Sequence, residues 1–360
     1  MLSRLTVVLV SLLLVALLLQ TAAIIWLCVL TLRTRTAELR SDECWGDAGR
    51  YCVGSSNTSL TKTSFNFLKH IRKLTIDKQY IPSFGNDTFL SEGLTELEEI
   101  SVQLSQLRTI ELGALNGMTK LKDLSLFGNE ISEILPGTFE KTRRLQYLSL
   151  GNNSIEHLHI GVFSGLISLI SLDLSRNKLH YVYPNTFFAL PNLKTLLLRY
   201  NPGLQVPTDR NFINSHTLLH LSIAYCKASS VSVETFANVS ALGWLELSYN
   251  NLKNLDINIF RALPELNTLY LYGNPLQCDC QLQEVWWWCE DRNIVTVEGS
   301  RVPECDTPSE VKGMTWGVLE KLQCSQGNVN SYVYYNNTNY NYTAIQETRT
   351  DTFTEADTEI

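Results

Sequence analysis

The stretch Leu121-Lys122-Asp123-Leu124-Ser125-Leu126-Phe127-Gly128-Asn129-Glu130-Ile131 contains the pattern that organises this chain of 360 residues. Leu124 and Leu126 alternate with polar residues, as expected of a strand with one buried face. An asparagine stands three residues after Leu126, and an aliphatic residue stands two residues later. The same frame recurs through the middle of the sequence, with clear copies that begin at Leu145, Leu169, Leu193, Leu218, Leu242 and Leu266.

The period of these copies predicts the architecture. Their first leucines stand 24 residues apart, except that Leu218 falls 25 residues after Leu193. Degenerate copies at Leu97 and Ile71 extend the series to nine coils, from about residue 65 to residue 276. One such strand cannot bury its apolar face alone, whereas parallel coils stacked on one another form a continuous core. We therefore expect an α/β repeat, a solenoid with one parallel sheet.

Two other positions of the frame also repeat. Where each strand ends, an inward-facing amide can satisfy backbone groups that have lost their ladder partners, which explains the asparagine. Cys226 occupies this position in one copy, and we expect it to be a buried thiol. Six residues before each first leucine, large apolar side chains predict a stacked core column. Its members are Leu115, Phe139, Phe163, Phe187, Phe212, Phe236 and Phe260, with Phe89 as a displaced counterpart.

The pattern resembles the leucine-rich repeat, and the resemblance covers most of the chain. After the last copy the sequence runs Asn274-Pro-Leu-Gln-Cys278-Asp-Cys280, followed by three tryptophans, Cys289, Cys305 and Cys324. This segment is similar to the C-terminal cap of extracellular leucine-rich repeat proteins, such as Toll-type receptor ectodomains, Slit, connectin-like adhesion proteins and the acid-labile subunit. The resemblance implies a horseshoe-shaped leucine-rich repeat solenoid with a concave parallel β-sheet and disulfide caps.

The nine cysteines are divided among these segments. The resemblance implies three pairs, Cys278–Cys305, Cys280–Cys324 and Cys44–Cys52, the last in a reduced N-terminal cap. Cys28 lies in the apolar N-terminal run, and Cys289 is left either buried or bonded to another chain. Zinc is the rival interpretation of the Cys-x-Cys motif. However, no histidine follows residue 220, and no Cys-x-x-Cys accompanies the motif to complete a zinc site. We therefore expect no metal and no cofactor.

The first forty residues differ from the rest of the chain. An almost uninterrupted apolar run from Leu5 to Leu32 is followed by Arg33, Arg35 and Arg40. The run exceeds the core of an ordinary secretory signal and is long enough to span a bilayer. Two interpretations stay open: a long cleaved signal, with a small-residue site near residues 21–23, or an uncleaved signal anchor. Both imply export of the chain after residue 40, with membrane contact only if the anchor is retained.

Composition supplies the remaining boundaries. We expect a signal peptide or anchor in 1–40, an N-terminal cap in 41–64, repeats in 65–276, a C-terminal cysteine-rich cap in 277–325 and a disordered tail in 326–360. Asn-x-Ser/Thr triplets support export and predict N-glycosylation. The six asparagines are Asn57, Asn86, Asn152, Asn238, Asn336 and Asn341.

Candidate binding residues lie between the leucines of the predicted strands. In the C-terminal copies these positions hold aromatic residues, whereas the N-terminal copies hold Asp, Glu, Ser and Gly. Tyr, Trp and Arg are enriched at binding hot spots, although tyrosine also suits a strand face by propensity alone. The candidate ligand contacts are Tyr200, Tyr225, Trp244, Tyr249, Tyr270, Tyr272, Arg199, His220 and Glu246.

These features predict a binding protein and not an enzyme. The sequence has no His-Glu-x-x-His, Gly-x-Ser-x-Gly, Gly-x-Gly-x-x-Gly or P-loop motif. Its net charge of −7 excludes a basic nucleic-acid binder. We expect an extracellular recognition protein, secreted or held at the cell surface by a signal anchor, that binds a protein ligand through its concave face. The alternatives are a matrix or adhesion component acting by homophilic contact and an inhibitor of a secreted enzyme.

Overall fold

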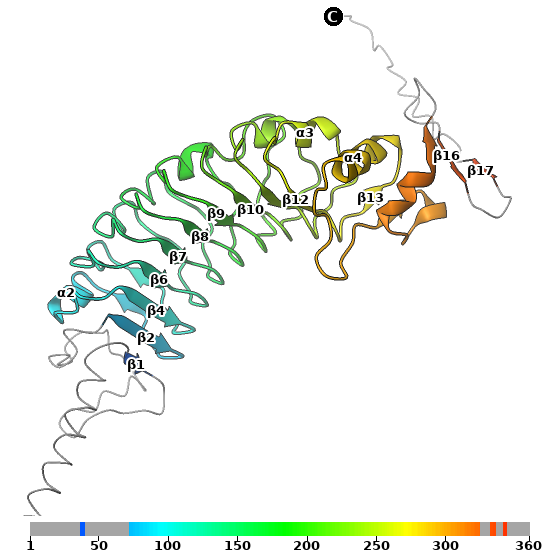
Figure 1. Ribbon diagram of the computed structural model, residues 1–360. Coiled ribbons are helices and arrows are strands. Elements are labelled where there is room, and N and C mark those ends of the chain that lie inside the picture. Colours follow the sequence, from blue (N-terminus) through cyan, green and yellow to red (C-terminus); the bar gives the residue numbers. More distant parts are fainter. Residues whose placement is uncertain (1–36, 40–71, 325–331, 336–340, 344–360) are drawn as a thin grey trace, which may run out of the picture.

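The computed structural model describes residues 37–39, 72–324, 332–335 and 341–343, with side chains described for residues 72–324. Ten parallel strands form one sheet in the order β1-β2-β4-β6-β7-β8-β9-β10-β11-β12. Figure 1 shows this sheet along the inner side of a curved solenoid. The predicted parallel-sheet solenoid is therefore confirmed.

The strands of this sheet are short, because all except β1 correspond to the few residues around the buried aliphatic side chains of one repeat. They are β1 (Ala37–Leu39), β2 (Lys73–Asp77), β4 (Glu99–Gln103), β6 (Asp123–Ser125), β7 (Tyr147–Ser149), β8 (Ser171–Asp173), β9 (Thr195–Leu197), β10 (His220–Ser222), β11 (Trp244–Glu246) and β12 (Thr268–Tyr270). Equivalent repeat positions pair across neighbouring strands, as Leu148 does with Leu172. Each repeat position therefore forms a column along the sheet.

β1 adds one strand that the repeat pattern does not contain. Its backbone pairs in parallel with β2, and Ala37 lies opposite Leu74. Residues 37–39 fall in the range that the sequence assigned to a signal or anchor. Pairing with the otherwise open edge of β2 explains their extended conformation.

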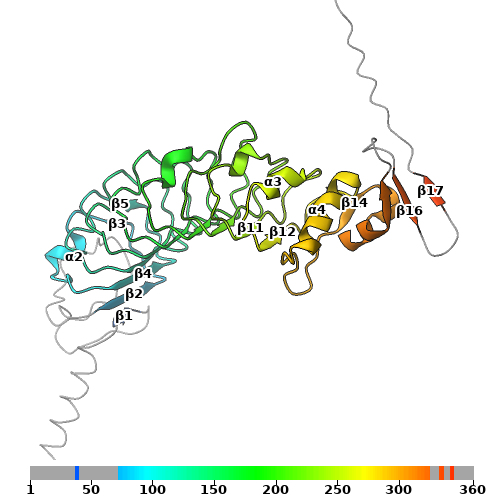
Figure 2. The ribbon, with the colours of Figure 1, turned by 45° about the horizontal axis from the view of Figure 1, so that its top comes forward.

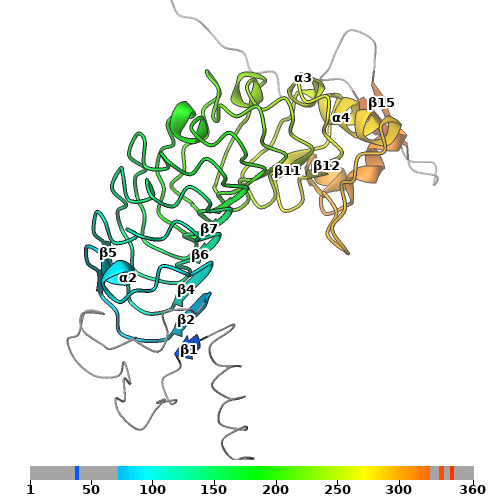
Figure 3. The same cartoon turned by 60° about the vertical axis from the view of Figure 1, so that its left-hand side comes forward.

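The outer side of the solenoid carries short helical turns and two small strands. These are β3 (Ser83–Phe84), α2 (Thr88–Ser91), β5 (Thr109–Ile110), η2 (Pro184–Phe187), η3 (Glu234–Phe236) and α3 (Ile257–Arg261). Figure 3 shows α2 and α3 on the side away from the sheet. Beneath them the predicted phenylalanine column is fully buried. The ring centroids of Phe139 and Phe163 lie 6.4 Å apart and those of Phe163 and Phe187 lie 5.9 Å apart, so the rings stack as expected.

The asparagine column joins each coil to the one before it. Asn177 Nδ2 donates to the carbonyl of Leu150 in the preceding coil and to that of Leu174 in its own, both at 3.0 Å. Its Oδ1 accepts the amide of Ile155 from the preceding coil at 3.0 Å. Asparagines in the neighbouring coils repeat these contacts. They are Asn129, Asn153, Asn201, Asn250 and Asn274.

Cys226 replaces the asparagine in the coil of β10. It is buried and unpaired, and its Sγ lies 3.4 Å from the carbonyls of Leu198 and Ala224. The amide of Leu204, which an asparagine here would accept, donates instead to the carbonyl of Asn201 in its own coil at 3.0 Å. The preceding coil thus compensates locally for the missing acceptor. Burial raises the pKa of the Cys226 thiol to about 12, in agreement with the predicted unreactive role.

The C-terminal cap closes the core with helix α4 (Cys280–Asp291). Asp279 caps this helix, because its Oδ1 accepts the amides of Gln281 and Leu282. Trp288 stacks on Phe260 at 6.2 Å and so extends the phenylalanine column into the cap. Cys289 is buried and unpaired, which agrees with the buried alternative. The disulfides are Cys278–Cys305 and Cys280–Cys324, the two C-terminal pairs that the resemblance implies.

Before and after α4 the chain forms smaller elements (Figure 2). They are β13 (Leu276–Gln277), which pairs with β14 (Cys305–Thr307), η4 (Ser309–Val311), η5 (Trp316–Lys321), β15 (Leu322–Cys324), β16 (Tyr332–Tyr335) and β17 (Asn341–Thr343). The prediction of a disordered tail over 326–360 needs correction at two places. β16 pairs antiparallel with β15 and with β17, as the Tyr, Val and Thr of these segments favour.

Several expectations lie outside the described residues. They are the apolar run, the N-terminal cap with Cys44 and Cys52, and the glycosylation sites Asn57 and Asn336. In the part of the chain that is described, no helix is long and apolar enough to cross a membrane.

The asparagine column predicts a graded loss of stability. Asn177→Ala leaves three buried backbone groups without partners, at about 1–3 kcal/mol each, so we expect the free energy of unfolding to fall by at least about 3 kcal/mol. Cys226→Ala removes only weak sulfur contacts and should cost about 1 kcal/mol. Urea denaturation of both variants checks this. Equal losses would contradict the structural role of the amide.

Candidate functional site

The predicted concave residues form one connected set of aromatic rings. Tyr200, Tyr225 and Tyr249 stack face to face, with centroid separations of 4.1 and 4.2 Å and interplanar angles of 11° and 16°. Tyr249 meets Tyr272 edge to face at 5.3 Å, and Tyr272 lies 5.9 Å from Tyr270. The series continues from Tyr270 to Trp244 at 5.6 Å and from Trp244 to His220 at 6.1 Å. Seven of the nine predicted contacts are therefore neighbours.

The tyrosine stack has an unusual backbone. Tyr200, Tyr225 and Tyr249 have φ angles of 60°, 56° and 53°, a left-handed conformation that costs non-glycine residues roughly 1–2 kcal/mol. The residue just before the asparagine column has positive φ in every coil, whatever its identity. The other members of this column are Lys78, Leu104, Gly128, Asn152, Arg176 and Gly273. The conformation therefore belongs to the repeat, and the tyrosines are an addition to it.

Positive φ in this column serves the backbone ladder. The amide of Tyr200 donates to the carbonyl of Ala224 in the next coil at 2.9 Å, and that of Tyr249 donates to the carbonyl of Tyr272 at 2.9 Å. The side chain then leans over the same column of the next coil. At Gly273 a Cβ atom would lie 2.5 Å from Tyr249 Cδ1, so glycine is required where the stack ends.

Both faces of the tyrosine stack are covered. The guanidinium of Arg176 lies 4.2 Å from the centre of the Tyr200 ring, and Tyr249 covers the backbone of Gly273. Only ring edges and hydroxyls remain open. They line a hollow of about 530 Å³ together with Lys178 and Lys227. The sequence analysis did not single out the two lysines, because only the stacking of coils places them beside the rings.

The second part of the site lies on the sheet itself. His220, Trp244 and Thr268 occupy one column of β10, β11 and β12, and Ser222, Glu246 and Tyr270 occupy the next outward-facing column. His220 is exposed, whereas Trp244 and Tyr270 are half-buried. Leu219, which is 37% exposed, flanks them. In this part the rings meet edge to face, whereas in the stack they lie face to face.

Glu246 is a buried acid beneath these rings. Its side chain is only 8% exposed, and its Oε2 accepts the hydroxyl of Ser222 at 2.6 Å. No cationic side chain of the described residues forms an ion pair with it. Burying a carboxylate without a countercharge is costly, so the site offers a place for a positive group from outside.

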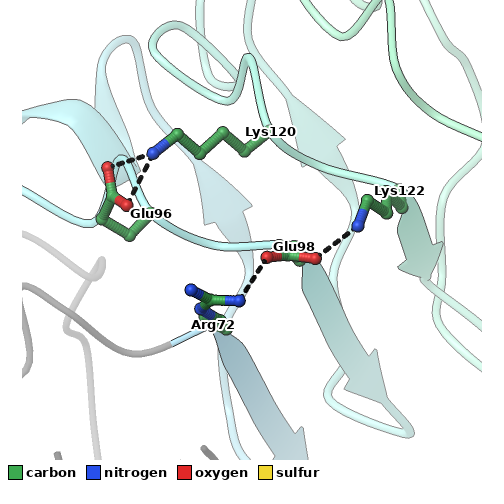
Figure 4. A network of polar contacts seen from close by, with 5 residues as sticks. All are labelled: Arg72, Glu96, Glu98, Lys120 and Lys122. Carbon is green, nitrogen blue, oxygen red and sulfur yellow. Dashed lines mark hydrogen bonds and ion pairs between the residues drawn. The ribbon is translucent and has the colours of Figure 1, made fainter. Parts of the chain in front are cut away.

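Acids at the other end of the concave face are neutralised within the protein (Figure 4). Glu98 contacts Arg72 at 3.2 Å and Lys122 at 2.5 Å, each from a neighbouring coil. Glu96 contacts Lys120 at 2.6 Å. The hydrogen bond from Lys122 holds the pKa of Glu98 below its usual value. These charges form pairs across coils, whereas Glu246 has no ion pair among the described residues.

Tyr272 has a different position from the other predicted contacts. It is only 3% exposed, and its hydroxyl donates to Glu298 Oε2 at 2.5 Å. The guanidinium of Arg301 lies 5.7 Å from its ring centre and contacts the same carboxylate oxygen at 3.0 Å. Tyr272 therefore supports the site from below. Arg199 is exposed and directly precedes Tyr200 of the tyrosine stack in the chain.

A loop of the C-terminal cap borders the site. Val295 pairs in parallel with Thr268, and Glu298 bridges Arg301 in a tight turn through Gly299. In Figure 1 this amber loop, which follows α4, extends on the sheet side beyond β12. Val295 and Val297 are 50% and 42% exposed on it. Sequence reasoning missed this loop, because its only local signal is the Glu-Gly-Ser turn.

The predicted glycosylation sites differ in exposure. Asn86 and Asn152 are exposed, and Asn238 is half-buried. Asn152 stands in the same column as Arg176 and the tyrosine stack. For Asn341 only the backbone strand β17 is described.

The repeats match a known family. The family model described as leucine rich repeat matches residues 95–154, 143–202 and 216–276. The chain is a leucine-rich repeat protein. In its described residues no cluster of three or more His, Cys, Asp or Glu side chains is placed to hold a metal ion.

Similar proteins cover parts of the chain. Mouse Nephrocan is 28% identical over 136 residues, which is 37% of this chain and 25% of Nephrocan. Human Amphoterin-induced protein 1 is 39% identical over 67 residues, or 18% of this chain and 14% of that protein. Chaoptin of Tribolium castaneum is 35% identical over 85 residues, covering 24% and 10%. The match thus spans a quarter or less of each of these three relatives.

One solved structure shares the fold over most of the chain. The structure of a TLR13–ssRNA13 complex superimposes with a TM-score of 0.55 and 25% identity, covering 68% of this chain and 39% of that one. The relatives are extracellular or cell-surface leucine-rich repeat proteins. Their solenoid is a scaffold for interactions with other molecules.

The contact between Tyr272 and the cap loop predicts a pH effect. Burial, followed by the adjacent Glu298, raises the pKa of Tyr272 to about 12, above the value of about 10 expected in the unfolded chain. The neutral hydroxyl therefore stabilises the folded state below pH 10, and this contribution is lost as the pH rises towards 12. We expect the free-energy difference between wild type and Tyr272→Phe to shrink over this range in denaturation experiments. A constant difference would contradict it.

Proposed function

We propose that the chain is an exported recognition protein that binds a protein ligand through the C-terminal half of its concave face. The observation that carries this proposal is the open cluster of His220, Trp244 and Tyr270 above the buried acid Glu246. Aromatic side chains of this kind supply most of the energy at protein interfaces. The similarity to extracellular and cell-surface proteins of this family supports an extracellular location.

The ligand that fits this surface presents a basic side chain beside apolar groups. A lysine or arginine from the partner would be attracted to the carboxylate of Glu246 and to the faces of Trp244 and Tyr270. On the rim, Arg176, Lys178 and Lys227 surround the tyrosine hydroxyls and suit acidic groups of the same partner. Complementary charges of both signs would fix its orientation.

The two parts of the aromatic set have different roles in this proposal. The faces of Tyr200, Tyr225 and Tyr249 are already occupied, so their stacking stabilises the rim of the sheet at about 0.5–1.5 kcal/mol per pair. Trp244 and Tyr270 have surface left to bury against a partner. We infer a binding role and not a catalytic one, because Ser222, whose hydroxyl donates to Glu246, is fully buried and cannot reach a substrate.

Binding is tested by screening purified extracellular domains against the full chain. We expect Trp244→Ala and Tyr270→Ala each to weaken a specific interaction at least tenfold, since each removes a central aromatic contact. Glu246→Gln should weaken it too and reduce its salt dependence. Phe188→Ala is the matched control, because Phe188 is 62% exposed on the outer side. Unchanged affinity in Trp244→Ala and Tyr270→Ala would refute the concave site.

Export is tested separately by N-terminal sequencing of the protein made by secreting cells. A mature start between residues 22 and 41 identifies a secreted protein, and an intact Met1 on membrane-bound material identifies a signal anchor. Retention of the whole chain in the cytosol would contradict both. Two disulfides in the C-terminal cap support the expectation of export.

A further inference from the structure

A recess lies on the outer side of the solenoid, away from the concave site. It has a volume of about 510 Å³, and its walls include Tyr183, Asn185, Thr186, Asn211, Asn214 and Asn238. This volume falls in the range of ligand pockets, about 300–1,000 Å³. Four side-chain amides, one hydroxyl and one half-exposed aromatic ring give it a neutral, strongly hydrogen-bonding lining.

The recess results from the one coil that is 25 residues long. The coils before and after it carry the helical turns η2 and η3 on the outer side, whereas this coil runs without a helix there. Its backbone is pinned to both neighbours instead. The amide of Asn214 donates to the carbonyl of Pro184 at 2.9 Å, and that of Ser215 donates to the carbonyl of Asn238 at 3.1 Å. The segment thus forms a floor between two raised turns.

Polar groups around the recess lack partners. Thr186 Oγ1 and Asn214 Oδ1 are buried without a hydrogen bond among the described residues. Asn214 Nδ2 donates to Asn185 Oδ1 at 3.0 Å, so the amide plane is held in place. A buried oxygen without a partner costs about 1–3 kcal/mol. Both oxygens belong to residues that line the recess, so its walls are rich in polar groups.

The occupant is suggested by the position of Asn238. This asparagine begins the triplet Asn238-Val239-Ser240 and lies in the wall of the recess. We propose that the first sugar of a glycan on Asn238 lies in this recess and hydrogen-bonds to its amides. An N-acetylhexosamine offers hydroxyl and amide groups to the other three asparagines and an apolar ring face to Tyr183. Because the sugar is tethered to the wall, its effective concentration is on the order of millimolar, and a weak site is enough to hold it.

This inference rests on the proposed export, because N-glycans are added in the secretory pathway. A seated sugar would contact three successive coils, those of η2, of the recess floor and of η3. It would act as a cross-link on the outer side of the solenoid. The glycan predicted on Asn152 has an exposed asparagine and no such recess, so the two sites of one chain provide an internal comparison.

The test uses the full chain from secreting cells, with Ser240→Ala and Ser154→Ala as matched variants. Each removes one glycan and keeps its asparagine. We expect Ser240→Ala to lower the melting temperature by about 2–4 °C, while Ser154→Ala leaves it unchanged. Under native conditions, peptide-N-glycosidase should release the Asn238 glycan at least tenfold more slowly than the Asn152 glycan, as followed by mass spectrometry of the peptides. Tyr183→Ala should raise the release rate at Asn238.

Equal release rates at the two asparagines, or a bare Asn238 in a chain that carries other glycans, would overturn the proposal and leave the proposed export intact. A chain without any glycan that stays in the cytosol would contradict export itself. An unchanged melting temperature in Ser240→Ala, with Asn238 occupied in the wild type, would show that the sugar does not cross-link the coils.

Discussion

The structure depends on satisfying backbone groups at the place where each strand ends. A parallel stack of short strands leaves amides and carbonyls without partners as the chain turns away from the sheet, and these groups are buried. Each asparagine of the column bonds to its own coil and to the coil before it, as Asn177 does with Leu174, Leu150 and Ile155. Leucines alone would bury apolar surface without setting the spacing of the coils. The asparagine amides set the spacing of the coils, and the side-chain columns on both faces follow from this spacing.

The aromatic rim is a consequence of this spacing. The residue before each asparagine adopts positive φ to keep its amide in the ladder, and its side chain then leans over the next coil. Coils about 4.8 Å apart bring flat side chains in this column to stacking distance, so Tyr200, Tyr225 and Tyr249 lie ring on ring. The stack uses its faces for cohesion within the protein. The proposed recognition rests on Trp244 and Tyr270, whose rings meet edge to face at 86°.

Residues with a fixed place in the repeat were predictable from sequence. The leucine, asparagine and phenylalanine columns recur at nearly constant spacing, so at least six copies support each assignment, and Cys226 was placed by the same register. Tyr272 shows what the repeat pattern alone cannot predict. Its repeat position holds the exposed Arg199 in one coil and the buried Ala224 and Ser248 in the next two, so the repeat alone does not determine its exposure. In the last coil a cap loop covers Tyr272 with Glu298 and Arg301. A repeat pattern cannot contain the contacts of a segment outside the repeat, and the same holds for β1, β16 and the valines of the cap loop.

The coil of Cys226 has a mechanical consequence. A solenoid pulled along its axis bears the load in series, and it parts first where neighbouring coils are least firmly joined. Asparagine gives an interface two strong side-chain bonds to the preceding coil, whereas the sulfur of Cys226 gives one long contact to Leu198 that it shares with Ala224. Within the described residues, the disulfides lie in the C-terminal cap. Under tension the chain would therefore separate into two blocks between β9 and β10, with the tyrosine stack divided at Tyr200 and Tyr225.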